Sequence, residues 1–258
     1  MRVFANGLRT LTLATIGLSA LLLVPQAANA QFTTFISSGH ADIEVASLPF
    51  PDGDTLEMAV HDDITDEEYD PATTLFLIED AALTTRNAQG QSGAAFDFLG
   101  VGVNDPYYLV FPTGGPGAPI IGVTSEEVDL TEFQDNIVFS LTGYTGPGTF
   151  SLYSNASNVF FNAAPGNVIT GTLPSTPSSG HTDYFYAFSA PGLYELTIQA
   201  QGTLLDGVTQ RTASATYFFN AGPLAATTVP EAGTLPLMIG AGCSVIGILA
   251  VRRRARKS

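Results

Sequence analysis

Tyr194–Ala200 (YELTIQA) and Ala213–Phe219 (ASATYFF) decide the fold class of this chain. Both stretches are rich in aromatic and β-branched residues, which is typical of β-strands. The residues between them include Asp206-Gly207, a dipeptide that favours a turn. We therefore expect these two strands to form the closing hairpin of an immunoglobulin-like sheet.

The same composition recurs along residues 31–222, in short runs separated by clusters of Gly, Pro, Asn and Asp. The other predicted strands are Ala41–Leu48, Thr55–Val60, Thr74–Ile78, Tyr107–Phe111, Ile120–Val123, Ile137–Leu141, Thr149–Tyr153, Asn158–Phe161 and Asp183–Ser189. Many short strands with such turns predict an all-β fold, an immunoglobulin-like β-sandwich built as one or as two β-subdomains. Leu173–Ser179 (LPSTPSS) is predicted as a loop, and as a hinge if there are two halves.

Residues 1–30 have the layout of a secretory signal peptide. Basic residues near the start precede the apolar run Leu11–Val24, and Ala28 and Ala30 occupy the two positions that a signal peptidase reads. The run is shorter than the ~20 apolar residues of a membrane span. We therefore expect a signal helix that signal peptidase removes, with the mature chain beginning near Gln31.

The C-terminal end has a different design. Residues 235–251 are apolar and predict a transmembrane helix, and the Arg-rich residues 252–258 predict a basic cytoplasmic tail. Val229, Pro230 and Glu231 lie just before the span, in a linker at residues 223–234.

This order of Val-Pro-Glu, apolar span and Arg-rich end resembles the PEP-CTERM sorting signal of bacteria. The resemblance implies an exosortase, a membrane cysteine protease that cuts near the motif and transfers the protein to the cell surface or the extracellular matrix. The inner membrane would then hold only an intermediate. The alternative is a tail anchor that is never processed.

The central domain, residues 31–222, is strongly acidic. It holds two basic residues, Arg86 and Arg211, against 23 acidic ones, which gives a formal charge of −21. Such a charge repels nucleic acid and excludes a nucleic-acid-binding function. The single cysteine of the chain, Cys243, lies in the apolar tail, so the domain contains no thiol ligand or thiol nucleophile. The sequence contains neither G-x-S-x-G nor H-E-x-x-H, and we expect no enzymatic activity.

Each of the three histidines is followed by an aspartate two positions later. The pairs are His40 and Asp42, His61 and Asp63, and His181 and Asp183. Residues i and i+2 of a strand lie on one face, ~6.5–7 Å apart. Imidazole and carboxylate together suit Zn²⁺, Mn²⁺ or Fe²⁺, so these six residues are the candidate ligands of a divalent metal ion. Alternatively, an aspartate could orient its histidine through the second ring nitrogen, or all three could be unrelated surface histidines.

The acidic segment Asp52–Asp70 surrounds His61. It could collect cations, but it lacks the glycine that an EF-hand loop requires. We expect most of its carboxylates to belong to a solvated loop.

Several short motifs in order resemble the choice-of-anchor M domain, a surface-anchored domain. The motifs are Ser38–Ile43, Phe98–Gly102, Ile121–Glu126, Gly146–Tyr153, His181–Phe188 and Pro191–Tyr194. The resemblance implies a surface protein that acts beside metal ABC transporters, and a PEP-CTERM subgroup controlled by a zinc repressor. His40 and His181 fall on the two histidine-bearing motifs of the family, whereas Asp183 stands where the family often has histidine.

Together these observations predict an exported, exosortase-sorted surface protein that binds a divalent metal, zinc first, for metal acquisition or buffering outside the cytoplasm. The alternative is a structural or adhesive matrix protein with no specific metal site.

Overall fold

The computed structural model describes residues 32–48, 55–169, 172–174 and 180–224. They belong to one compact unit that begins at Phe32. The predicted signal peptide with Ala28 and Ala30, the sorting motif Val229–Glu231, the apolar residues 235–251 and the basic tail lie outside the described residues. Within the part of the chain that is described, no helix is both long and apolar enough to cross a membrane.

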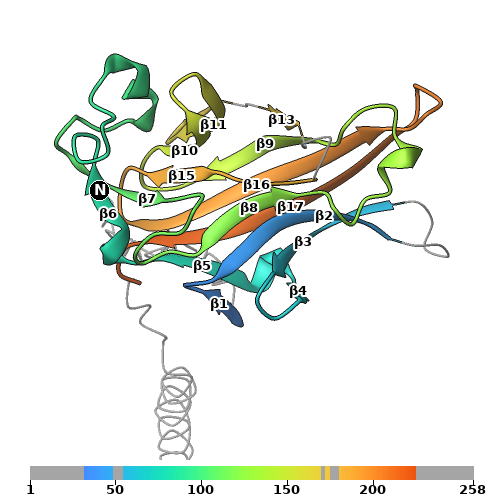
Figure 1. Ribbon diagram of the computed structural model, residues 1–258, viewed down its shortest axis with the longest axis horizontal. Helices are drawn as coiled ribbons and strands as arrows, with labels where there is room; N and C mark the ends of the chain where they lie inside the picture. Colours follow the sequence, from blue (N-terminus) through green and yellow to red (C-terminus); the bar gives the residue numbers. More distant parts are fainter. Residues whose placement is uncertain (1–31, 49–54, 170–171, 175–179, 225–258) are drawn as a thin grey trace, which may run out of the picture. The chain divides into compact units, whose positions relative to one another are not determined.

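The described residues form three β-sheets connected by loops and short 3-10 turns (Figure 1). The turns are η1 (Pro71–Thr73), η2 (Asp80–Ala82), η3 (Ala94–Leu99) and η4 (Leu130–Glu132). The first sheet has the strand order β1 (Thr34–Ile36), β5 (Thr74–Ile78), β17 (Gln210–Ala221), β16 (Gly192–Thr203), β9 (Val138–Thr145) and β13 (Thr172–Pro174). The second has the order β12 (Asn167–Ile169), β11 (Asn158–Ala164), β10 (Phe150–Asn155), β15 (Phe185–Phe188), β7 (Pro106–Val110) and β6 (Leu83–Thr85).

The third sheet has the order β14 (His181–Asp183), β8 (Ile120–Thr124), β2 (His40–Leu48), β3 (Thr55–Asp62) and β4 (Glu67–Tyr69). β2 pairs in parallel with β8 and antiparallel with β3, while β14 pairs antiparallel with β8. Two segments far apart in the chain, near residues 40 and 181, therefore lie on the same sheet.

The hairpin of β16 and β17 is the longest strand pairing among the described residues, and Figure 1 shows the two strands side by side in orange and red. Burial alternates along β16, where Tyr194, Leu196 and Ile198 face the core and the residues between them are more exposed. This alternation arises because successive side chains of a strand point to opposite faces.

One apolar core is shared by all three sheets. Phe219 of β17 is fully buried, and its ring lies 4.9 Å from that of Phe76 and 5.6 Å from that of Phe188. Tyr217 donates a hydrogen bond to the carbonyl of Ala59, 3.0 Å away, which ties the first sheet to the third. Aromatic rings of the first and second sheets thus form the centre of the core, and the third sheet packs against it.

The all-β expectation is confirmed, and all eleven predicted strands overlap observed ones. Asp183–Ser189, however, is not one strand. The chain leaves the third sheet after Asp183 and enters the second at Phe185, because Tyr184 turns its ring into the core between them. Leu173 belongs to β13 rather than to a loop, and residues 175–179 lie outside the described residues. The strands that no prediction covered are short: β1, β4, β6, β12 and β13. Of β14, only Asp183 was predicted.

Replacing Phe219 with alanine should destabilise the protein by about 3–5 kcal/mol, because the lost ring leaves a cavity at the shared centre. Phe35→Ala is the matched control, since Phe35 is 54% exposed, and it should change stability little. Urea unfolding followed by circular dichroism measures both, and equal effects of the two changes would contradict a core centred on Phe219.

Candidate metal centre

The strand register of the third sheet places Asp42, Gly122 and Asp183 in one row. Gly122 of β8 is the partner of Asp183 on one side and of Asp42 on the other. Neighbours in a row lie on the same face of a sheet, and so do residues two positions apart along a strand. His40 and His181 precede the two aspartates by two positions, so all four side chains share one face.

Gly122 leaves room for these side chains to meet. A Cβ atom at this position would lie under 3.0 Å from Asp42 Oδ1, His181 Nε2 and Asp183 Oδ1. A glycine inside a strand often marks such a close approach. Gly122, which has no side chain, therefore forms the floor of the site.

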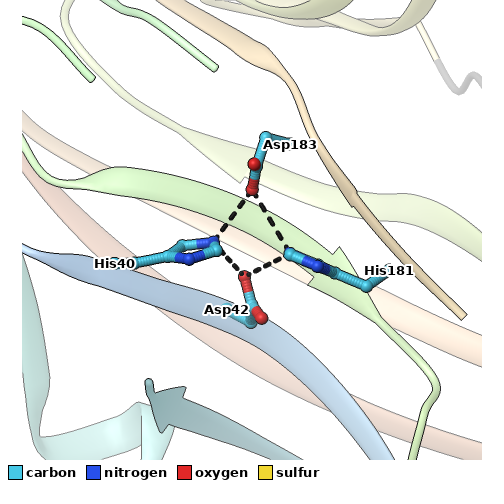
Figure 2. A group of neighbouring side chains, drawn as sticks. All are labelled: His40, Asp42, His181 and Asp183. Carbon is cyan, nitrogen blue, oxygen red and sulfur yellow. Dashed lines mark hydrogen bonds and ion pairs between the residues drawn. The ribbon is translucent and has the colours of Figure 1, made fainter. Parts of the chain in front are cut away.

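Four ligand atoms converge above this floor, and Figure 2 shows the two imidazoles approaching from opposite sides with the two carboxylates between them. His40 Nε2 lies 2.9 Å from Asp183 Oδ1 and 3.3 Å from Asp42 Oδ1. His181 Nε2 lies 3.3 Å from each of the same oxygens. One ligand atom from each residue lies within 4.8 Å of the other three.

These separations match those of a small metal site. In a tetrahedral zinc site with bonds of about 2.0–2.1 Å, neighbouring ligand atoms lie about 3.3–3.4 Å apart. Three of the four His–Asp separations are 3.3 Å. The group formed by His40, Asp42, His181 and Asp183 could thus hold a metal ion, and we call it the HDHD site.

Burial makes a cation favourable at the HDHD site. Asp42 is 2% exposed, and a buried carboxylate requires a compensating charge or hydrogen bonds. Hydrogen bonding to Asp42 is the main reason that the pKa of His181 is raised to about 9, against the opposing effect of burial, and the charges of Asp42, Asp183 and Glu126 add to the rise. A proton on His181 therefore stabilises the metal-free site, and a metal ion would replace it.

Asp63 lies behind His40 rather than in the HDHD site. Its Oδ2 is 2.7 Å from His40 Nδ1, the ring nitrogen that faces away from the site. A carboxylate in this position fixes the ring orientation and leaves Nε2 free to act as a ligand. The orienting role considered for the aspartates therefore fits Asp63, although it acts on His40 and not only on His61.

His61 stays outside the HDHD site. It is the register partner of Asp42 but lies on β3, on the side of β2 opposite to β8. Its Nδ1 is 3.7 Å from Glu44 Oε2 and its Nε2 is 3.4 Å from Asp63 Oδ1. Of the six predicted ligands, the structure brings four together and leaves His61 and Asp63 beside them.

Two residues of this face were not predicted, namely Gly122 and Glu44. Glu44 continues the alternation of His40 and Asp42 along β2, and its burial raises its pKa to about 7, with smaller effects from His61 and other carboxylates. The alternation in β2 and the glycine inside the apolar β8 were the available sequence signals.

The acidic segment around His61 forms β3, β4 and the turn between them. Asp63, Asp66, Glu67 and Glu68 are exposed, as expected, but Glu67 and Glu68 lie in β4 rather than in a loop. Asp52 and Asp54 lie outside the described residues.

Gly122→Ala should lower the affinity for Zn²⁺ at least tenfold, because the added methyl group would occupy the floor of the HDHD site. The backbone of Gly122 has no positive φ, so the substitution itself introduces no backbone strain. Gly93→Ala is the matched control, since a Cβ there meets no atom within 4 Å. Calorimetric titration measures both affinities, and an unchanged affinity in Gly122→Ala would exclude this floor.

The metal-free protein should lose stability as the pH rises through about 9. The pKa of His181 is raised in the folded state, so its contribution to stability is complete below the unfolded pKa of ~6.5 and is lost above the folded pKa. Urea unfolding between pH 6 and 10, compared with His181→Gln, isolates this contribution. A difference between the two proteins that does not change with pH would contradict it.

No protein-family model, curated protein or solved structure matches this chain. The case for the HDHD site therefore rests on its own geometry.

Proposed function

We propose that the protein is exported to the cell surface and there binds one divalent metal ion, zinc first, at the HDHD site. Its role is metal acquisition or buffering outside the cytoplasm. The observation that carries this proposal is the convergence of four ligand atoms from β2 and β14 over Gly122.

The donor set supports a transition metal. Two imidazole nitrogens and two carboxylate oxygens suit Zn²⁺, and they also suit Mn²⁺ or Fe²⁺. Two aspartates balance the charge of a divalent ion, so the loaded site is neutral. Calcium is disfavoured because it takes oxygen ligands almost alone.

The number of ligands favours binding over catalysis. Catalytic zinc sites keep one position for water and take three protein ligands, whereas four protein ligands close the coordination sphere. The site is also open enough to exchange its ion, because the side chains of His40, His181 and Asp183 are each between 21% and 26% exposed. A closed but reachable site fits a protein that takes up and passes on metal.

The location and partners come from the chain ends and from family resemblance. Signal peptidase would cut after Ala30, exosortase would act near Val229–Glu231, and a metal ABC transporter would receive the ion. The assignments to the choice-of-anchor M family and to the immunoglobulin-like sandwiches are part of the same proposal. An adhesive matrix protein would share the export signals but would not need the four converging ligands.

Changes of single ligands test this function. His40→Gln, His181→Gln and Asp183→Asn should each weaken the tightest Zn²⁺ binding by more than the roughly 10–100-fold that loss of an outer partner costs. Asp135→Asn removes the same charge from an exposed position and should leave the affinity unchanged. Calorimetry and metal analysis of the purified protein give the affinities. Wild-type affinity in all three ligand variants would favour the matrix protein.

A further inference from the structure

Glu44, His61 and Glu68 lie beside the HDHD site, on the same face of the third sheet. We propose that Glu44 and His61, with Glu68, bind a second divalent transition-metal ion, and that Asp63 orients one histidine at each of the two positions. This inference does not depend on the first site being loaded, because the two groups share no ligand.

Glu44 is the observation that carries the proposal. The residue is 2% exposed, and its Oε2 accepts no hydrogen bond from any residue that the structure describes. A buried carboxylate oxygen without a partner is costly, and such atoms are rare in folded proteins. No described residue satisfies this oxygen, which makes it a candidate ligand for a bound cation.

His61 faces the same oxygen with its Nδ1 atom, at 3.7 Å. This distance is too long for a hydrogen bond. It is close to the separation of about 3.3–3.4 Å between neighbouring ligand atoms in a tetrahedral zinc site. A metal ion between the two atoms would satisfy both.

Asp63 lies between the rings of His61 and His40. Its Oδ1 lies 3.4 Å from His61 Nε2, while its Oδ2 lies 2.7 Å from His40 Nδ1. Each oxygen thus faces one ring nitrogen that points away from a metal position, which is how outer carboxylates orient metal-binding histidines. With the proton of His61 on Nε2, the lone pair of Nδ1 points toward Glu44.

Glu68 is the third candidate ligand, from the next strand. It is the register partner of His61 on β4, and it lies near enough to Glu44 to act on it electrostatically. Its exposure opens the second position to solvent, in contrast to the buried floor of the HDHD site. One imidazole nitrogen with two carboxylates suits Zn²⁺ or Mn²⁺ more than Ca²⁺.

Metal analysis of the purified protein after loading with Zn²⁺ and gel filtration tests the proposal. The wild-type protein should retain two ions per chain, and Glu44→Gln and His61→Gln should each retain one. His181→Gln should lose the other ion and keep this one. Asp63→Asn should weaken the binding of both, as titration calorimetry would show.

Glu67→Gln is the matched control, because it removes one charge from β4 while its side chain is held by the hydroxyl of Tyr69. It should retain two ions. The same ion content in the wild-type protein, Glu44→Gln and His61→Gln would overturn the second site. If only the HDHD site fails, His181→Gln will match the wild-type protein while Glu44→Gln loses its ion. Thermal unfolding in chelator confirms that each variant is folded.

Discussion

The pairing of β8 between β2 and β14 is the constraint on which this molecule's chemistry depends. It brings residues near 40 and residues near 181 onto one face, and it places Gly122 between their aspartates. Because the side-chain period of a strand is two, a shift of one residue in either pairing would move the ligands of that strand to the opposite face. The shared core beneath the third sheet, with Tyr186 donating to the carbonyl of Gly122 at 3.5 Å, opposes such a shift.

The negative charge of buried carboxylates explains why the HDHD face of the third sheet favours a bound cation. The carboxylates of Asp42 and Glu44 are buried on one strand, and Glu44 Oε2 accepts no hydrogen bond from any described residue. A proton on His181 balances part of this charge in the metal-free protein, and a divalent ion would balance more of it. The acidic surface of the domain raises the local concentration of cations around the site, which favours rapid loading.

The strands could be predicted from the sequence because runs of aromatic and β-branched residues, and the turns between them, are local patterns. The i, i+2 spacing also identified His40, Asp42, His181 and Asp183 correctly as neighbours on strand faces. The sequence could not show which histidines meet, because that depends on the register between distant strands. His61 carries the same pattern, but it lies beyond Asp42 on β3, and the break at Tyr184 that separates β14 from β15 comes from packing between sheets. The signal peptide and the sorting motif were also predicted from local patterns of sequence, but their residues lie outside the described residues.

X-ray absorption spectroscopy of the protein loaded with one equivalent of Zn²⁺ tests the central claim most directly, because it counts the ligands of the bound ion. The account predicts four nitrogen and oxygen ligands at about 2.0–2.1 Å, with the scattering of two imidazoles. A spectrum with six oxygen ligands and no imidazole, or with no zinc retained by the protein, would contradict it.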